Sequence, residues 1–155
     1  MDAIDGERKG QTGAHAALRR ALDKAGWRFT RQRAAVYDYL RDSDQHPTAE
    51  EVYSAVRRRI PRISLATVYK ALDALVASRL ASKIAHVDGP ARYDCRQDAH
   101  YHMRCLRTGK IRDLPTPFDS TLIDKLDPSL VESLQEQGFS VVDYRLELLG
   151  YFEKP

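Results

Sequence analysis

Cysteine is scarce in this chain of 155 residues, which contains only Cys95 and Cys105. Two cysteines cannot build the disulfide framework of a small secreted protein. Long apolar runs are also missing, and the lack of any stretch of 18 apolar residues excludes a transmembrane helix. The first dozen residues carry acidic side chains and no apolar segment. We therefore expect no secretory signal, no membrane partner and a cytoplasmic location.

A strong charge excess is likewise missing, because the formal net charge is only +3. The charges are unevenly distributed, however. Residues 1–90 hold 16 Lys or Arg against 11 Asp or Glu, whereas residues 91–155 hold 9 against 11. This asymmetry indicates that the first part meets a polyanion and that the second part has another task. An excess of this size is by itself a weak signal for DNA.

The first part of the chain predicts four helices. Apolar residues recur at helical spacing over residues 14–24, and Gly26 follows as a C-terminal stop. Thr30 can cap a second helix, while Thr48 and Glu51 form a capping box that opens a third helix reaching Ile60. Ser64 can cap a fourth helix that extends to residue 79.

A hairpin is predicted after these helices. Residues 81–86 and 91–95 resemble strands, and Asp88, Gly89 and Pro90 between them are typical of a turn. Helices followed by such a hairpin are the pattern of a winged helix-turn-helix. Further along, strands are expected at residues 100–105, 109–114 and 140–148, and helices at residues 118–126 and 128–137.

These elements predict an α+β protein with two domains. Residues 1–13 are expected to be a disordered lead-in, residues 14–96 a winged helix-turn-helix DNA-binding domain, and residues 97–155 a small α/β dimerisation domain. A domain of about 59 residues is marginal in size for its own core. We therefore expect it to be stabilised by pairing with a second copy, which would also provide two DNA-reading heads.

The fourth helix is the candidate recognition helix. A helix-turn-helix inserts its second helix into the major groove, with phosphate contacts near the helix N-terminus. The candidate DNA-binding residues are Ser64, Thr67, Tyr69 and Lys70, with Arg28 ahead of the second helix. A winged helix without DNA affinity is the alternative, because basic side chains at helix ends also suit the helix dipole and plain solvation.

A second group of residues is suited to metal binding. His100 and His102 are two positions apart on an expected strand, so both imidazoles should project from one face. Asp94, Asp113 and His46 are candidate partners. A mixed nitrogen and oxygen shell suits Fe²⁺, Mn²⁺ or Zn²⁺. Each residue also has an ordinary interpretation, as a surface histidine pair, a loop histidine or edge carboxylates.

Five strings together resemble the ferric uptake regulator family of metal-responsive repressors. They occur in family order and spacing, and the resemblance covers nearly the whole chain. The strings are HPTAEEVY at 46–53, ISLATVYKAL at 63–72, RYD at 92–94, HYH at 100–102 and GKIRD at 109–113.

The resemblance implies a homodimer that binds double-stranded operator DNA. It also implies that metal between the two domains brings the DNA-reading heads into the competent posture. The positions of the family's regulatory ligands match His46, Asp94, His100, His102 and Asp113. Its DNA-reading positions match Tyr69, Lys70 and Arg28, and many iron sensors have Arg where this chain has Lys70.

The last ligand position implies a subfamily. Iron sensors of the family commonly have Glu there, whereas its peroxide sensors commonly have Asp, as this chain does at Asp113. In peroxide sensors, peroxide acts at bound Fe²⁺ and a histidine ligand is oxidised, which releases DNA. His46 and His100 are the candidates for that oxidation. A repressor that responds to iron, manganese or zinc levels is the alternative.

Two departures from the family pattern limit the expected metals. Most members hold a structural zinc with four cysteines in two C-x-x-C pairs, whereas this chain has Cys105 and Thr108 at the first pair and no second pair. One thiolate cannot hold such a zinc, so packing must replace it, and Tyr151 and Phe152 are candidates to fill the space. Tyr144 replaces a histidine of many members. We therefore expect one regulatory Fe²⁺ or Mn²⁺ per subunit, with Zn²⁺ as the alternative, and no structural zinc.

Two other function classes compete with a peroxide-sensing repressor. A mononuclear metal enzyme could use His100, His102 and a carboxylate as a facial triad, but the sequence indicates neither a substrate pocket nor a general base. A haem-responsive regulator would be expected to carry a Cys-Pro motif, which this chain lacks. We therefore expect a regulator and no enzymatic activity.

Overall fold

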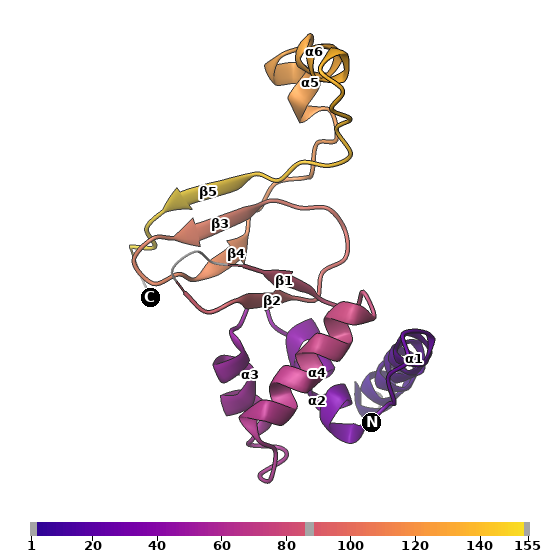
Figure 1. Ribbon diagram of the computed structural model, residues 1–155. Coiled ribbons are helices and arrows are strands. Elements are labelled where there is room, and N and C mark those ends of the chain that lie inside the picture. Colours follow the sequence, from indigo (N-terminus) through magenta and orange to yellow (C-terminus); the bar gives the residue numbers. More distant parts are fainter. Residues whose placement is uncertain (1–2, 86–88, 154–155) are drawn as a thin grey trace. The chain divides into compact units, whose positions relative to one another are not determined.

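The computed structural model describes residues 3–85 and 89–153, and its chain forms two compact units (Figure 1). The first unit ends at Gln97 and the second begins at Asp98. The expected strand end at His86 and the turn residue Asp88 lie outside the described residues. None of the helices formed by described residues has both the length and the apolar content needed to cross a membrane.

The first helix begins earlier than the sequence indicated. Helix α1 runs from Ala3 to Lys24, whereas the apolar pattern predicted a helix only over residues 14–24. The segment contains no proline and several strong helix formers, and its glycines weaken a helix without terminating it. Gly26 follows the helix with a left-handed φ of 80°, a conformation typical of a helix end.

The next three helices begin at the predicted caps. Thr30 caps α2 (Arg31–Arg41), and the Thr48–Glu51 capping box opens α3 (Ala49–Val56). Ser64 caps α4 (Leu65–Ala77) by accepting the Thr67 amide. These three caps are confirmed, but α3 ends at Val56 and not at Ile60.

The first unit contains a two-stranded hairpin. β1 (Ser82–Ile84) pairs antiparallel with β2 (Arg92–Asp94), so that Ser82 lies opposite Asp94. β2 is also tied to the segment before α3, because Tyr93 donates its amide to the Pro47 carbonyl at 3.0 Å. An antiparallel bridge between Thr48 and Arg92 continues this pairing. All three residues of β2 are buried as a result.

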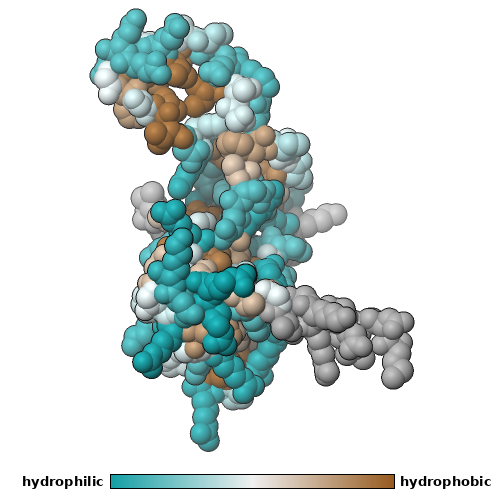
Figure 2. Space-filling view, turned by 90° about the vertical axis from the view of Figure 1, so that its right-hand side faces the viewer, coloured by the Kyte–Doolittle hydropathy of each residue, from teal (hydrophilic) through white to brown (hydrophobic). Residues whose placement is uncertain are grey.

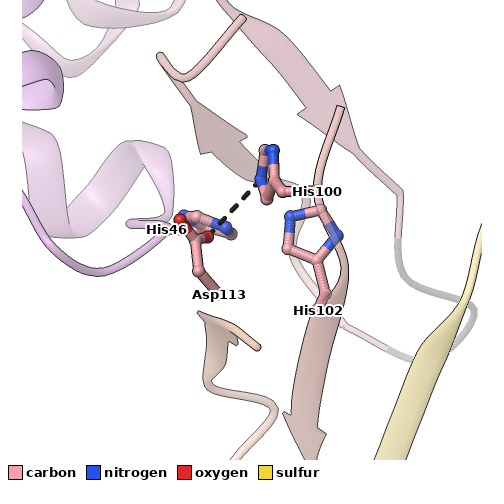
Figure 3. A group of neighbouring side chains, drawn as sticks. All are labelled: His46, His100, His102 and Asp113. Carbon is pink, nitrogen blue, oxygen red and sulfur yellow. Dashed lines mark ion pairs between the residues drawn. The ribbon is translucent and has the colours of Figure 1, made fainter. Parts of the chain in front are cut away.

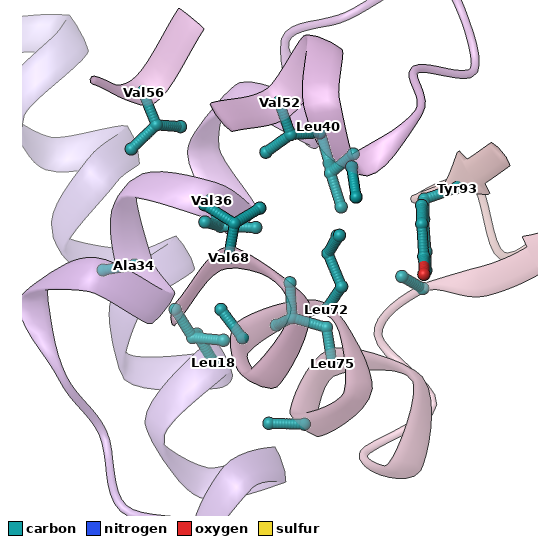
Figure 4. Packing of buried hydrophobic residues seen from close by; sticks show 14 of the residues in the cluster. Leu18, Ala34, Val36, Leu40, Val52, Val56, Val68, Leu72, Leu75 and Tyr93 are labelled. Carbon is teal, nitrogen blue, oxygen red and sulfur yellow. The ribbon is translucent and has the colours of Figure 1, made fainter. Parts of the chain in front are cut away.

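The hydrophobic core of the first unit is formed by one face of each helix and by the hairpin (Figure 4). Apolar residues at helical spacing on α1, α2, α3 and α4 meet in its centre, which explains why these segments fold together. The large side chains with at most 1% exposure in this core are Leu18, Leu22, Val36, Val52, Val68, Leu72, Leu75 and Tyr93.

The second unit is built on a three-stranded sheet of order β4-β3-β5. β3 (His102–Cys105) pairs antiparallel with β4 (Ile111–Asp113) and parallel with β5 (Glu147–Gly150). Gly109 has a left-handed φ of 66° in the β3–β4 turn and donates its amide to the Cys105 carbonyl at 2.8 Å. The expected α+β class is confirmed by this combination of helices and sheets.

The last strand is shorter and later than predicted. The alternation of residues 140–148 predicted a strand with one buried face, but strand structure begins only at Glu147 and Val142 is 95% exposed. β5 pairs with the four residues of β3, so an alternating pattern beyond that length has no strand to pair with. The Arg104 guanidinium fastens β5 to β3 with two contacts of 2.9 Å to Glu147 Oε1.

Two short helices, α5 (Leu122–Leu126) and α6 (Leu130–Glu136), complete the second unit. Neither contains a buried residue. Figure 2 shows apolar side chains gathered in the upper part of the view, where this segment lies. Leu126 is 75% exposed and Phe139 is 59% exposed.

Candidate metal centre and nucleic-acid interface

The β3–β4 pairing brings a histidine and an aspartate together in the second unit. His102 and Asp113 are direct partners across the two antiparallel strands, and opposite residues of such a pair project from the same face. His100 lies just before β3, not within it, which corrects the expectation of two histidines on one strand. Its ring still meets that of His102, with ring centroids 4.6 Å apart and an interplanar angle of 71°.

These three side chains form a compact donor group (Figure 3). One ligand atom from each of His100, His102 and Asp113 lies within 4.8 Å of the others. The dashed line in Figure 3 joins His100 Nε2 and Asp113 Oδ1, which are 3.5 Å apart. The figure also draws His46, a residue of the first unit.

A hydrogen bond orients the His100 ring. Its Nδ1 lies 2.7 Å from the Asp98 carbonyl oxygen. A carbonyl oxygen only accepts, so Nδ1 carries the proton, and Nε2 of the neutral ring holds the lone pair. Two imidazoles and one carboxylate are a donor set that suits Fe²⁺, Mn²⁺ or Zn²⁺, so this group could hold such an ion.

The other two predicted ligands meet within the first unit. His46 is 4% exposed and Asp94 is 5% exposed. The distance between His46 Nε2 and Asp94 Oδ2 is 4.0 Å. The pairing of β2 with the segment before α3 places them there, because His46 precedes Pro47 and Asp94 is the last residue of β2.

Arg92 holds this part of the first unit in place. Its guanidinium Nη1 donates to the His46 carbonyl at 2.8 Å and to Glu51 Oε2 at 3.1 Å. The same carboxylate oxygen of Glu51 accepts the Thr48 amide in the capping box. The capping box thus connects α3, the His46 loop and β2, a role that its sequence signature does not indicate.

The neighbouring thiol of Cys95 does not add to this donor pair. Burial, and then the negative charge of Asp94, raise the pKa of the Cys95 thiol to about 11. A thiol with that pKa is protonated at neutral pH, and the thiolate is the form that binds metals. Cys95 Sγ instead donates to the Leu80 carbonyl at 3.2 Å.

The N-terminal part of α4 presents polar side chains to solvent. The Ser64 and Thr67 hydroxyl oxygens are 2.8 Å apart, and Ser64 Oγ accepts the Thr67 amide at 3.1 Å. Tyr69 is 40% exposed and donates its hydroxyl to Glu50 Oε1 on α3 at 2.8 Å. Lys70 is exposed, as is Arg28 before α2, whose carbonyl accepts from the Arg33 guanidinium at 2.5 Å.

The structure therefore brings the predicted metal ligands together as two groups, one in each unit: His46 with Asp94, and His100 with His102 and Asp113. Four of the five predicted DNA-binding residues lie at the start of α4. The bond from Tyr69 to Glu50 was missed, because the two residues are 19 positions apart and the sequence shows Glu50 only as a first-turn acid of α3.

Comparison with known proteins connects these features to a family. The sequence model of the ferric uptake regulator family matches residues 24–149 of this chain. The chain belongs to the ferric uptake regulator family. Three of the strings that carry the family resemblance can be located in the fold. Residues 46–53 cover the loop before α3 and the first part of that helix. Residues 63–72 cover the start of α4, and residues 109–113 end in β4.

Three family relatives are informative. The peroxide-responsive repressor PerR of Staphylococcus epidermidis is 36% identical over 132 residues, covering 84% of this chain and 82% of the relative. The peroxide operon regulator of Bacillus subtilis is 36% identical over 129 residues, covering 83% and 84%. A solved structure of a zinc-bound manganese uptake regulator is 30% identical, with a TM-score of 0.65 over 87% of this chain and 98% of the other.

Where the resemblance to the ferric uptake regulator family placed a zinc-binding pair of cysteines, this chain has Cys105 and Thr108. Cys105 is 2% exposed at the end of β3. A hydrogen bond from the Thr108 side chain, and then one from the backbone of Phe152, lower the pKa of the Cys105 thiol to about 6. The C-terminal segment lies close by, because Leu106 donates its amide to the Gly150 carbonyl at 2.8 Å.

Two aromatic side chains of the C-terminal segment stack under arginines in this family member. The Arg112 guanidinium lies 4.6 Å from the Phe152 ring centroid, and the Arg107 guanidinium lies 5.3 Å from that of Tyr151. These contacts connect the segment to the β3–β4 hairpin. Tyr151 and Phe152, which were expected to fill the space of a structural zinc, therefore pack against this hairpin.

Tyr144, which replaces a histidine of many family members, belongs to an aromatic cluster. Its ring stacks on Phe118 at 5.2 Å between centroids, and its hydroxyl lies 2.6 Å from that of Tyr101. The Tyr144 hydroxyl also donates to the Asp119 carbonyl. Burial and the bond to Tyr101 raise the pKa of Tyr144, so its phenol stays protonated at neutral pH and is a poor metal ligand.

Proposed function

We propose that this member of the ferric uptake regulator family is a peroxide-sensing, metal-dependent transcriptional repressor. The observation that carries the proposal is the group of His100, His102 and Asp113, a metal-binding donor set with aspartate at the last position. Two relatives that are 36% identical are named as peroxide regulators, which supports peroxide as the signal.

The proposed regulatory site includes His46 and Asp94 of the first unit. The family resemblance assigns all five residues to one ion per subunit, giving three imidazole nitrogens and two carboxylates as donors. Their donor types suit Fe²⁺ or Mn²⁺, and Zn²⁺ as the alternative. The family resemblance implies that an ion held by these residues brings the DNA-reading heads into the competent posture.

The proposed signal is oxidation of a ligand histidine, with His46 and His100 as the candidates. Bound Fe²⁺ supplies the redox chemistry that activates hydrogen peroxide. Transfer of one oxygen atom from peroxide to an imidazole carbon gives 2-oxohistidine and leaves one molecule of water. The oxidised ring would be a poorer donor, which would weaken metal binding and release the operator.

The proposed DNA contacts come from the start of α4. Ser64 and Thr67 lie at the helix N-terminus, where hydroxyls and amides suit phosphate binding. Tyr69 can present its ring edge to a thymine methyl group, and Lys70 can bind guanine or a phosphate. Arg28, which is exposed ahead of α2, is the proposed minor-groove contact.

The protein is proposed to act as a homodimer through its second unit. β5 forms one edge of the sheet, and its Leu148 and Leu149 are 51% and 61% exposed. A sheet edge that pairs with no further strand in the described part of the chain, and that carries exposed leucines, is suited to pairing with a second copy. The names of the relatives describe regulators, which supports a regulator in the cytoplasm and not an enzyme.

DNA binding with and without peroxide tests this function. Duplex DNA would be selected from random sequences by the Mn²⁺-loaded protein, and its binding then measured for the Fe²⁺-loaded and Mn²⁺-loaded forms before and after a low dose of hydrogen peroxide. We expect only the Fe²⁺ form to release the duplex, with a gain of one oxygen atom on the peptide containing His46 or His100 in mass spectrometry.

Two variants sharpen this experiment. His102→Ala should lose metal-dependent DNA binding while remaining folded, whereas His15→Ala should keep it, because His15 pairs with Asp38 outside the proposed site. Asp113→Glu should keep metal-dependent binding and respond less to peroxide. Unchanged operator affinity of His102→Ala would contradict a metal switch at this group.

A metal-level sensor is the second candidate function. The similarity to a zinc-bound manganese uptake regulator favours it. In that case both metal forms would keep the duplex after peroxide, and only a chelator would release it. The aspartate at position 113 would then have no bearing on the signal.

A further inference from the structure

The exposed face of α4 carries one side chain that differs from its neighbours. Among the described residues of the first unit, Tyr69 is the one large apolar side chain that is clearly exposed, at 40%. A single exposed apolar side chain is ordinary on a protein surface, so what distinguishes Tyr69 is its place on the candidate recognition helix. On a recognition helix, a tyrosine ring is suited to the apolar edge of a thymine.

A hydrogen bond from outside α4 fixes how Tyr69 is presented. Its hydroxyl donates to Glu50 Oε1 at 2.8 Å, and Glu50 lies in the first turn of α3. This bond, more than any other cause, lowers the pKa of Glu50 and raises that of Tyr69. At neutral pH the carboxylate is therefore charged and the phenol is neutral, which are the states that the bond requires.

The bond determines what Tyr69 can offer to DNA. A phenol has one O–H group, and Glu50 already accepts it. Tyr69 is left with its ring edge and its oxygen lone pairs, which suit base edges, and it has no proton to donate to a phosphate. The ring has only two side-chain torsions, so one bond at its tip restrains its direction strongly.

The Glu50 carboxylate also disfavours contact between Tyr69 and a DNA phosphate. Glu50 is exposed beside the tip of Tyr69 and carries a negative charge. Phosphates of the DNA backbone carry the same charge and are repelled at short range. A register that places a base edge opposite Tyr69 is therefore favoured over one that places a phosphate there.

We propose that Glu50 is a positioning residue that gives Tyr69 its base specificity. This inference rests on the proposed function, because it requires α4 to read operator DNA. Glu50 acts through Tyr69 and does not itself contact a base. Its contribution is to the discrimination between operator and other DNA, and not to affinity in general.

The test measures that discrimination with full-length, Mn²⁺-loaded protein. Fluorescence anisotropy would give the affinity for the selected duplex and for a random-sequence duplex of the same length. Glu50→Ala should lower the ratio of the two affinities about tenfold, which corresponds to one hydrogen bond of about 1.4 kcal/mol. Affinity for the random duplex should stay the same or rise, because a negative charge is removed.

Three further variants separate positioning from charge and from simple structural support. Glu50→Gln keeps an acceptor for the Tyr69 hydroxyl and should retain most of the discrimination. Tyr69→Phe should lose it as Glu50→Ala does, and adding Glu50→Ala to Tyr69→Phe should have no further effect. Asp73→Asn removes one negative charge from an exposed position of α4 and should leave the ratio unchanged.

The inference would be overturned by an equal loss of affinity for both duplexes in Glu50→Ala. It would also be overturned if Glu50→Ala had its full effect in the Tyr69→Phe background. A wild-type protein that selects no duplex, or does not distinguish it from random DNA, gives a different result. That result would overturn the proposed function, and this inference with it, before any variant is measured.

Discussion

The two units differ in how they bury apolar surface. All 16 residues of the hydrophobic core cluster belong to the first unit, and its helices α2, α3 and α4 each begin at a side-chain cap. In the second unit, the buried apolar residues among those described are Tyr101, Cys105 and Ile111, and α5 and α6 have no side-chain cap bond. Of the nine large apolar side chains that are clearly exposed among the described residues, eight lie in the second unit.

This contrast fits the proposed roles of the two units, which are DNA binding for the first and dimerisation for the second. A unit with its own dense core can present α4 as a rigid reading surface. A unit with exposed leucines, and with a sheet edge to which no other described strand is paired, gains most from a second copy. We therefore expect substitutions in the first unit to act on folding stability, and those in the second to act on association.

The largest contrast should come from paired leucine truncations. Leu72 is 0% exposed in α4, and Leu72→Ala should lower the free energy of unfolding by about 2–5 kcal/mol because it leaves a cavity. Leu130 is 37% exposed in α6, so Leu130→Ala should cost less than about 1 kcal/mol. Urea unfolding at fixed protein concentration measures both. An equal loss of unfolding free energy in the two variants would show that the packing around Leu130 contributes as much stability as the packing around Leu72.

The next largest effect is expected at the edge of the sheet. Leu149→Glu places a charge on the exposed edge strand β5, and two copies would face each other across a two-fold interface. We expect the dimer dissociation constant to rise at least about a hundredfold, because like charges in an interface cost several kcal/mol. Sedimentation equilibrium measures it.

Leu126→Glu is the matched control, because Leu126 is equally apolar and 75% exposed but lies in α5. It should leave the dissociation constant within about threefold of wild type. Dissociation by Leu126→Glu and not by Leu149→Glu would move the interface from the sheet edge to the helices.

A smaller contrast is expected between two helix starts. Thr48→Ala removes the side-chain acceptor of the Glu51 amide in α3 and should lower the free energy of unfolding by about 1 kcal/mol. Ser129 precedes α6 and makes no such bond, so Ser129→Ala should stay within about 0.5 kcal/mol of wild type. Thermal unfolding of both variants measures the difference. A loss for Ser129→Ala that matches Thr48→Ala would contradict the contrast in capping.

The smallest effect concerns how the stability of the second unit falls at acid pH. A hydrogen bond from Lys125, and then one from Thr121, lower the pKa of Asp119 from 3.8 to about 2. Its charged form therefore adds stability above pH 3.8, and this contribution is lost as the pH falls toward 2. Asp119→Asn should flatten the decline of the unfolding midpoint between pH 4 and pH 2.

Asp124→Asn in α5 removes one charge near the same residues and is the control for Asp119→Asn. It should leave the decline of the unfolding midpoint unchanged. If both variants have the same pH profile as wild type, the bonds of Asp119 contribute nothing measurable to stability.

Local signals in the sequence were sufficient where the cause is local. The caps at Thr30, Thr48 and Ser64 were predicted correctly, because capping depends on residues three positions apart. The start of α1 and the place of β5 were predicted wrongly. The first helix was placed only where apolar residues recur at helical spacing, and α1 extends beyond that pattern. The last strand was placed on an alternation alone, although a strand also needs a neighbour of matching length.

The candidate metal and DNA sites also contain features that the sequence predicts and features that only the fold creates. Residue types and family strings in the sequence predicted all five candidate ligands, and the register of His102 opposite Asp113 supports three of them as a group. The spacing of His100 and His102 predicted that both lie on one strand. His100 instead lies before β3, and its ring approaches His102 from outside the strand. The bond from Tyr69 to Glu50 has no signature in the sequence, because it depends on how α3 packs against α4.

The sequence by itself determined the starts of α2, α3 and α4, the family, and the residue types of the candidate metal ligands. These follow from residue identity and short spacing, which require no knowledge of packing. The tertiary structure alone decided which candidate ligands meet within each unit, which side chains remain exposed on the second unit, and that Tyr69 bonds to Glu50. These depend on contacts between residues far apart in the chain, and only the packing of one element against another creates them.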